Sequence, residues 1–321
     1  MSDQTNGRNE LNALSRAAAY NLANVTKTRP QYGAITPKWL TRFLDFKGLE
    51  TGLYRVNRVV EGETPLDVLC SQEKPSAVIP SGYIEYETKP REYVLNNIST
   101  ILNVSTAVED IYSSPYDQAE EQLALAIESL RERQESQIIN NDDYGLLKNI
   151  APGQRIQPRS ASGAPTPDDF DELISKVWKE PSFFLAHPRA IAAFGRECTK
   201  RGVPPATVNL QGGTFLTWRG IPILPSNKLL VDGLKEPKSQ SGKTNILLIR
   251  TGEAKRDVIG LYQAGLKDEA GRGLSVRFTG INDRGVASYL LSLYCSAAIL
   301  ADDAIAVLED VEVGEYHDYE D

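Results

Sequence analysis

One uninterrupted amphipathic pattern, in residues 113–141, constrains the fold more than any other part of the chain. Ser114 is placed to cap a helix, Pro115 suits its first turn, and the pair Asn140-Asn141 marks its end. An apolar stripe recurs along one face at helical spacing, formed by Leu123, Ile127, Leu130 and Ile138. A helix over residues 115–140 would be roughly 39 Å long, at 1.5 Å per residue. Such a long stripe needs an extended surface, and we expect a β-sheet to provide it.

Charged side chains occupy the opposite face of this helix, spaced so that opposite charges can pair along it. They are Glu120, Glu121, Glu128, Arg131, Glu132, Arg133 and Glu135. Gln134 interrupts the apolar stripe between Leu130 and Ile138. The pattern predicts one face packed on the body of the protein and one face directed away from it.

The composition is that of a folded, soluble protein and argues against several classes of partner. Of 321 residues, 41% are hydrophobic and 24% are charged, which suits one elaborated domain or two to three subdomains. The formal net charge of -8 argues against coating nucleic acid, which requires a basic surface. The most apolar run, residues 286–300, is too short to cross a bilayer, and the N-terminus lacks the apolar core of a signal peptide.

Cysteine and histidine are few and scattered. Cys70, Cys198 and Cys295 form no CxxC pair, which predicts buried thiols in a reducing compartment and hence a cytoplasmic protein. The two histidines, His187 and His317, belong to no group with metal-ligand spacing, and His187 suits a helix N-cap. We therefore expect no metal site, no cofactor and no enzymatic active site.

Two glycine-containing segments invite a functional interpretation. Gly242-Lys243-Thr244 matches the end of a phosphate loop. However, Pro237 stands where that loop requires its first glycine, and the following residues predict a strand in place of the phosphate-binding helix. A polar hairpin turn is the better interpretation. Gly271-Arg272-Gly273 is likewise interpreted as a flexible loop.

An amphipathic segment, residues 10–25, is separated from the rest of the chain by a proline-containing linker. Its apolar stripe consists of Leu11, Leu14, Ala18, Leu22 and Val25. A helix attached through such a linker needs a surface for its stripe. That surface could belong to the same chain or to a neighbouring subunit.

Residues 46–96 form a strand-and-loop excursion without an apolar core of its own. Alternation and β-branching predict strands at residues 53–60 and 66–70, while repeated glycines and prolines interrupt the segments between them. The excursion is either a hairpin on the main domain or a protruding loop that pairs with another chain.

The remaining chain mixes helices with short strands, which predicts an α+β fold. Thr166 and Pro167 open one helix. Pro188 opens another, which Gly202 ends. The expected strands are residues 97–108, 182–187, 214–220, 244–250, 257–263 and 274–280, and the run 286–313 interrupted at Asp302-Asp303. Residues 203–213 are predicted to form a loop.

The arm, the excursion and the long helix, in that order, resemble the phage major capsid fold of the Hong Kong 97 type. Longer strings resemble the shell proteins of the second encapsulin family, A subgroup, from about residue 17 to residue 319. Among them are RERQESQIINN, APTPDDFDELISKVWK, FFLAHP, AIAAFGREC, TWRGIPILPS, LSVRFTGIN and SYLLSLYCS. No stretch is long enough for the cyclic-nucleotide-binding insertion of the B subgroup, which favours the A subgroup.

This resemblance implies a division of the chain into named parts. They are an N-terminal arm at residues 1–45, an extended loop at 46–96, a peripheral domain at 97–167 and 286–313, an axial domain at 168–285 and an acidic tail at 314–321. The long helix would be the spine of the peripheral domain, with its charged face toward a shell surface.

The resemblance also implies self-assembly into a small icosahedral shell of the T=1 type. The shell would enclose a cargo enzyme, typically a cysteine desulfurase of sulfur metabolism. By analogy, the tip of the axial domain would line a pore. The candidate pore residues are Val203, Pro204, Pro205, Ala206 and Thr207. The alternative is that they form an ordinary surface loop. Two other functions stay open, a viral capsid subunit that packages nucleic acid and a nucleotide-binding enzyme that uses Gly242-Lys243-Thr244.

Overall fold

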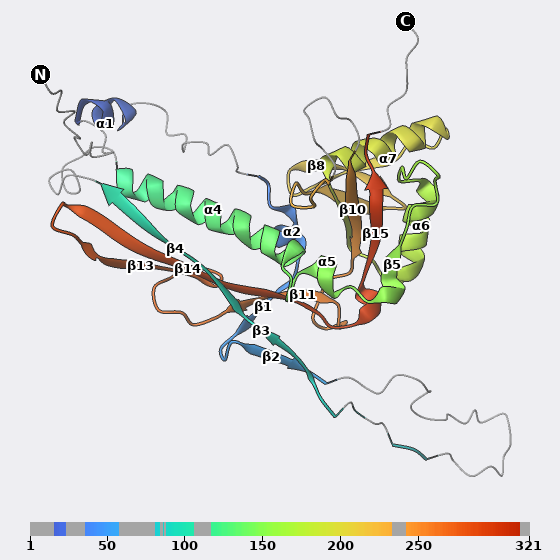
Figure 1. Cartoon of the computed structure of the whole chain (residues 1–321), viewed down its shortest axis with the longest axis horizontal. Helices are drawn as coiled ribbons and strands as arrows, with labels where there is room; N and C mark the ends of the chain where they lie inside the picture. Colours follow the sequence, from blue (N-terminus) through green and yellow to red (C-terminus); the bar gives the residue numbers. More distant parts are fainter. Residues whose placement is uncertain are drawn as a thin grey trace, which may run out of the picture.

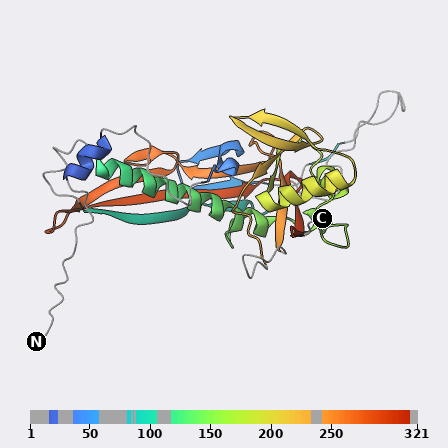
Figure 2. The ribbon, with the colours of Figure 1, turned by 90° about the horizontal axis from the view of Figure 1, so that it is seen from above.

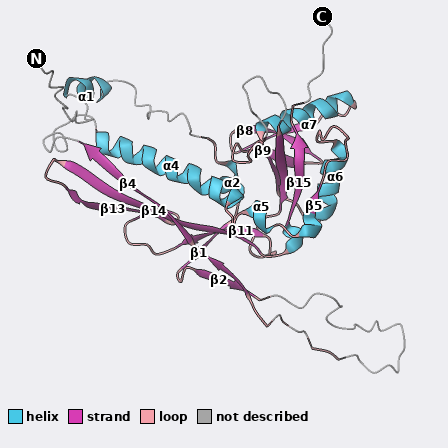
Figure 3. Ribbon diagram, in the orientation of Figure 1, coloured by secondary structure: helices cyan, strands magenta, loops and turns pink. Residues whose placement is uncertain are grey.

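The computed structural model describes residues 16–23, 36–57, 81–83, 86, 88–105, 117–232 and 242–314. The molecule is elongated and built on two β-sheets, one beneath a long helix and the other next to two shorter helices (Figure 1). The view from above shows the same elongation (Figure 2). Helices and strands are both present throughout, so the α+β class predicted from the sequence is confirmed (Figure 3).

The first sheet is organised around β14, Val286–Ile299, the longest strand that the structure describes. Its first half pairs antiparallel with β13 and its end with β11, while β4 runs antiparallel along its other edge. Strand β1 extends the sheet by pairing parallel with β11. The bounds are β1 Phe46–Leu49, β4 Asn96–Ser105, β11 Val258–Gln263, β12 Glu269–Gly271 and β13 Leu274–Ile281.

Helix α4, Gln118–Asn140, lies on this sheet, as its apolar stripe predicts. Leu123, Ile127 and Leu130 pack with side chains of β4, β13 and β14. Ile138, further along the stripe, belongs to a second cluster between the two sheets. The stripe therefore fastens the helix along the sheet and at the junction with the rest of the molecule.

The start of α4 differs from the prediction. Asp117, not Ser114, caps the helix, because its carboxylate accepts a hydrogen bond from the Glu120 amide at 3.0 Å. The predicted end is confirmed, since the helix stops at Asn140 and Asn141 is its C-cap. At 23 residues, α4 is roughly 35 Å long.

The second sheet has the strand order β5-β15-β10-β6-β9-β8-β7. Helices α6, Pro167–Lys176, and α7, Pro188–Lys200, pack beside it and bring Phe170 and Phe194 together, with their ring centroids 3.9 Å apart. The strands are β5 Arg155–Ile156, β6 Phe183–Ala186, β7 Ala206–Leu210, β8 Gly213–Trp218, β9 Ile221–Pro225, β10 Lys243–Ile249 and β15 Ile305–Glu312.

Both helices of this part begin where local signals predict, and α7 also ends there, whereas α6 ends at Lys176, before the stop expected at Pro181. Thr166 and Asp169 form a capping box at the start of α6. The ring of His187 accepts a hydrogen bond from the Arg189 amide at 3.1 Å and caps α7. Gly202, with φ of 69°, follows the end of α7, where a left-handed conformation favours glycine.

The strand pairing divides the chain differently from the predicted domain boundaries. Strands β11 to β13 belong to the predicted axial domain, yet they pair into the sheet beneath α4. Strand β15 belongs to the predicted peripheral domain, yet it pairs with β10 in the second sheet. Strand β1, part of the predicted extended loop, also joins the first sheet. Each correction has the same reason: these strands pair with partners far away in the sequence, which local patterns do not specify.

A buried ion pair lies where the chain passes from one sheet to the other. Arg250 follows β10 and Asp257 precedes β11, and their side chains are paired and 4% and 0% exposed. Arg250 also reaches Asp303 at 3.2 Å, and Lys179 binds the same carboxylate at 2.7 Å. The pair links the ends of two strands that belong to different sheets.

Candidate functional site

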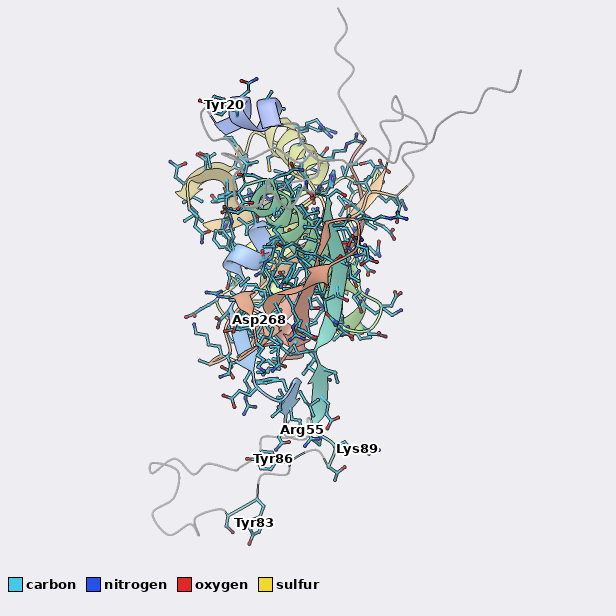
Figure 4. The ribbon with its side chains drawn as sticks, turned by 90° about the vertical axis from the view of Figure 1, so that its left-hand side faces the viewer. Tyr20, Arg55, Tyr83, Tyr86, Lys89 and Asp268 are labelled. Atoms are coloured by element: carbon cyan, nitrogen blue, oxygen red, sulfur yellow. The ribbon has the colours of Figure 1, made fainter. Side chains whose placement is uncertain are left out.

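A two-stranded hairpin projects from the body of the molecule (Figure 1). Its strands, β2 Leu53–Val56 and β3 Arg91–Val94, pair only with each other in the described part of the chain. Tyr83 and Tyr86 are 96% and 61% exposed, and they lie beyond Arg55, away from the body (Figure 4). Exposed aromatic side chains and unpaired strand edges are typical of surfaces that contact another chain.

The base of this hairpin is fixed to the first sheet. The Tyr93 hydroxyl donates to the Ile299 carbonyl at 2.5 Å, and the Tyr54 hydroxyl donates to Glu253 at 3.1 Å. Burial and the bond to Glu253 raise the pKa of Tyr54, while the hydrogen bond from Lys47 lowers the pKa of Glu253. A hairpin that is held at its base and projects beyond the sheet favours the protruding-loop interpretation.

Within the predicted amphipathic segment of the arm, the structure describes helix α1, Arg16–Ala23, which lies near the start of α4 (Figures 1 and 2). Within it, Ala18 is half-buried and Tyr20 is 61% exposed. Three other members of the predicted stripe lie outside the described residues: Leu11, Leu14 and Val25. The fourth, Leu22, belongs to α1, but its side chain lies outside what the structure describes. The helix is thus present, and its inter-subunit contact stays a prediction.

The last part of the arm, residues 36–45, docks on α4 through a partly buried charged cluster. Glu132 accepts hydrogen bonds from the Thr36 amide at 2.6 Å and the Thr36 hydroxyl at 2.8 Å. Lys38 lies 2.5 Å from Glu128, and Lys228 pairs with Glu132. Burial opposes ionisation of Glu132, but the hydrogen bonds from Lys228 and Thr36 outweigh it and lower the pKa. We call these five residues the docking cluster.

The docking cluster corrects the prediction that the charged face of α4 points outward. Glu132 and Glu135 are 9% and 2% exposed. The segment before α2, Trp39–Phe43, and the chain after β9 cover the second half of the helix and enclose these carboxylates. Sequence reasoning missed this site, although Gln134 within the apolar stripe was a signal that the helix is buried on more than one side there.

The predicted pore residues lie between α7 and β7. Val203 is 48% exposed, and Pro204 beside it is also exposed. Ala206 and Thr207 do not belong to a loop, because they begin strand β7 and pair with β8. The predicted loop over residues 203–213 is therefore wrong for residues 206–210, which form β7, and for Gly213, which begins β8.

A tight turn explains this error. Gln211 and Gly212 have φ of 48° and 80° and reverse the chain between β7 and β8. Residues in such left-handed conformations join the strands of a short hairpin. Strand β7 is only five residues long, so the loop signals of Pro204-Pro205 before it and Gln211-Gly212 after it dominate the local sequence. The structure thus places the exposed segment 203–205 at the base of a β-hairpin.

The described residues give little support to small-molecule chemistry. Gly242-Lys243-Thr244 leads into strand β10, so this segment lacks the helix N-terminus with which a phosphate loop binds phosphate. No group of three or more potential metal ligands occurs among the residues that the structure describes. Cys198 and Cys295 are buried free thiols, as predicted, while Cys70 lies outside the described residues. In the described helices, none combines the length and the hydropathy needed to span a bilayer.

The arrangement of the two sheets and the long helix matches solved capsid structures. The capsid of a native GTA particle aligns with a TM-score of 0.59, covering 94% of this chain and 99% of that one, at 11% sequence identity. At this identity the match concerns the fold alone. The protein therefore has the capsid fold of the Hong Kong 97 type.

Closer comparisons define the family. The model of the SrpI-like type 2A encapsulin shell proteins matches residues 54–315. The type 2A encapsulin shell protein SrpI of Synechococcus elongatus is 54% identical over 307 residues, 96% of each chain. A chain of the holo-SrpI encapsulin complex from that organism aligns with a TM-score of 0.79 at 52% identity, covering 96% of this chain and 99% of that one. The chain belongs to the type 2A encapsulin shell protein family, and it is a structural shell subunit and not an enzyme.

Proposed function

We propose that this subunit assembles with copies of itself into an icosahedral shell of the T=1 type and that the shell encloses a cysteine desulfurase. The observation that carries the proposal is the alignment with the holo-SrpI encapsulin complex over 96% of the chain. The identity of the cargo, and with it a role in sulfur metabolism, is what the sequence resemblance implies. Two buried free thiols, Cys198 and Cys295, support a reducing compartment, and we place the shell in the cytoplasm.

Two elements of the subunit favour contacts between copies. The β2–β3 hairpin leaves both its edges unpaired within the described chain, and α1 is connected to the body through the docking cluster. In a closed symmetric assembly, each copy offers the same edges and grooves to its neighbours. Repeated around a shell, modest contacts become strong through avidity.

We place a shell opening at residues 203–205, where the chain between α7 and β7 is exposed. The exposed Val203 and Pro204, directly before the β7–β8 hairpin, support this position. A density map of assembled particles tests it. Val203 is expected beside an opening on a symmetry axis, and a neighbouring subunit packed over Val203 would contradict the proposal.

The cargo is tested by producing the shell together with a cysteine desulfurase and purifying the particles by size. Uniform hollow particles are expected, with the desulfurase inside them and protected from added protease. The family resemblance implies that the cargo carries a disordered N-terminal targeting segment, so the control is a desulfurase that lacks this segment, which should be left out of otherwise normal shells. Equal exclusion of both enzymes would reject this cargo. An absorbance spectrum dominated by nucleic acid would instead support the viral-capsid alternative.

Removal of residues 1–30 is expected to lower the yield of closed particles by on the order of tenfold or more, because a lost contact is repeated at every subunit. Electron microscopy and size-exclusion chromatography measure the yield. Two single substitutions refine the test: Leu14→Asp alters the predicted apolar stripe, while Asn12→Asp places the same charge off the stripe. Normal particles from the truncated chain would refute the assigned role of the arm.

A further inference from the structure

A small cavity of about 200 Å³ lies where α4, the start of β1, the end of β11 and the turn between β12 and β13 meet. Its polar lining contains three cations and no carboxylate. These residues are Lys38, Thr41, Arg131, Gln134, Tyr262 and Arg272. A cavity lined in this way is positively charged and rich in hydrogen-bond donors.

The two arginines of the cavity form no direct ion pair within the part of the chain that the structure describes. Neither Arg131 nor Arg272 forms an ion pair with any residue that the structure describes, whereas Arg155, Arg219 and Arg250 each pair with a carboxylate. The hydrogen bonds of Arg131 go to neutral acceptors, Gln134 Oε1 at 3.0 Å and the Arg272 carbonyl at 3.3 Å. Burial lowers the pKa of Arg131; the nearby Cys295 and Glu128 oppose this effect, and the charge of Arg272 adds to it. An anion in the cavity would compensate both charges.

Lys38 contributes to the field of the cavity but is already neutralised. Its ammonium group lies 2.5 Å from Glu128 and 3.6 Å from Glu132. The uncompensated positive charge is therefore that of Arg131 and Arg272. Planar guanidinium groups bind oxyanions through paired, charge-assisted hydrogen bonds.

The turn that carries Arg272 is tightly constrained, which contradicts its interpretation as a flexible loop. A Cβ atom at Gly273, which has φ of 66°, would lie 2.6 Å from the Tyr294 carbonyl oxygen. A Cβ atom at Gly271 would lie 3.2 Å from Arg131 Nη2. Glycine at both positions lets the turn approach α4 and the neighbouring strands closely. The backbone thus holds the two arginines at one cavity.

We infer that this cavity binds a tetrahedral oxyanion such as inorganic phosphate or sulfate. The guanidinium groups of Arg131 and Arg272 supply the charge, and the hydroxyl group of Tyr262 is a further donor. The cavity volume suits a small free anion and is too small for a nucleotide. Because its lining comes from α4, β11 and the β12–β13 turn, the bound anion would connect the long helix to the sheet beneath it.

Titration of assembled shells with inorganic phosphate, at an ionic strength kept constant with sodium chloride, tests the site by calorimetry. The unsubstituted shells are expected to bind phosphate with one site per subunit. Arg131→Gln and Arg272→Gln should each weaken binding by roughly 10- to 100-fold, the usual value of a hydrogen bond to a charged group. Arg272 is exposed on a turn, so its substitution is expected to leave assembly intact.

Matched controls remove the same charge elsewhere. Arg133→Gln lies on the same helix but lines the separate groove between α4 and β4, and Arg284→Gln lies in the turn between β13 and β14. Both are expected to bind phosphate like the unsubstituted shell. Absence of binding in unsubstituted shells, as when a neighbouring subunit fills the cavity, would overturn the proposal. Equal affinity of Arg272→Gln and Arg284→Gln would also overturn it.

Discussion

Asp257→Asn is expected to destabilise the subunit by about 3–5 kcal/mol, because it leaves a buried guanidinium group without its charge partner. The side chains of Arg250 and Asp257 are 4% and 0% exposed, so water cannot replace the lost carboxylate. Asp303, at 3.2 Å from Arg250, is 28% exposed and already shared with Lys179. Denaturant unfolding of the purified protein measures the loss as a lower transition midpoint.

An exposed ion pair provides the control for this substitution. Asp268 and Arg277 are each 54% exposed, and Asp268→Asn should change the unfolding free energy by about 0–1 kcal/mol. Replacing the buried pair together, as Arg250→Met with Asp257→Leu, should recover much of the stability, since no charge is then left unpaired. An Asp257→Asn variant as stable as Asp268→Asn would show that the pair contributes little.

The buried pair also has a consequence for assembly. Arg250 and Asp257 flank the connection between β10 and β11, which belong to different sheets. Loss of the pair should therefore loosen the orientation of one sheet relative to the other. A closed shell requires the same subunit shape at every position. We expect Asp257→Asn to lower particle yield more than its stability alone would predict.

Local sequence signals predicted where α6 and α7 begin and where α7 ends. The capping box at Thr166, the N-cap at His187 and the stop at Gly202 each depend on residues within one turn of a helix end. The stripe of α4 likewise identified its partner as a sheet. Such signals are legible because the interacting residues are neighbours in the sequence.

The order of the strands could not be predicted in the same way. Strand β1 pairs with β11 and β15 with β10 through contacts between distant segments, and both were assigned to other parts of the chain. Alternation of apolar residues identifies a strand but not its partner. The family itself was found through shared sequence strings, since no catalytic or ligand motif accompanies a structural role.

The docking cluster was missed for a related reason. A carboxylate on a helix is usually exposed, so Glu132 and Glu135 were assigned to the outward face. Only the folded chain brings Thr36, Lys38 and Lys228 to this part of α4. Burial of a charge becomes acceptable once such partners surround it, and local sequence does not contain that information.

At neutral pH, Glu132→Gln is expected to destabilise the protein by about 2–3 kcal/mol, because the partly buried ammonium group of Lys228 loses its charged acceptor. Glu135→Gln, one turn further along α4, is the matched control. Burial raises the pKa of Glu135, although Ser226 donates a hydrogen bond to it at 3.0 Å. Glutamine resembles the protonated form that this site favours, so we expect no loss of stability from Glu135→Gln.

The two glutamates should also respond to pH in opposite directions. The pKa of Glu132 is lowered in the folded state, so its contribution is present above the unfolded pKa and is lost as pH falls through the folded pKa. The pKa of Glu135 is raised, so stability is lost as pH rises from the unfolded pKa through the folded one.

Unfolding free energies measured from neutral to acidic pH separate these effects. Glu132→Gln should converge with the unsubstituted protein in acid, and Glu135→Gln should gain relative to it as pH rises. Equal and pH-independent losses of unfolding free energy in both variants would contradict the roles assigned to Glu132 and Glu135. The expected pattern would identify Glu132 as the residue whose protonation weakens the contact between the arm and α4.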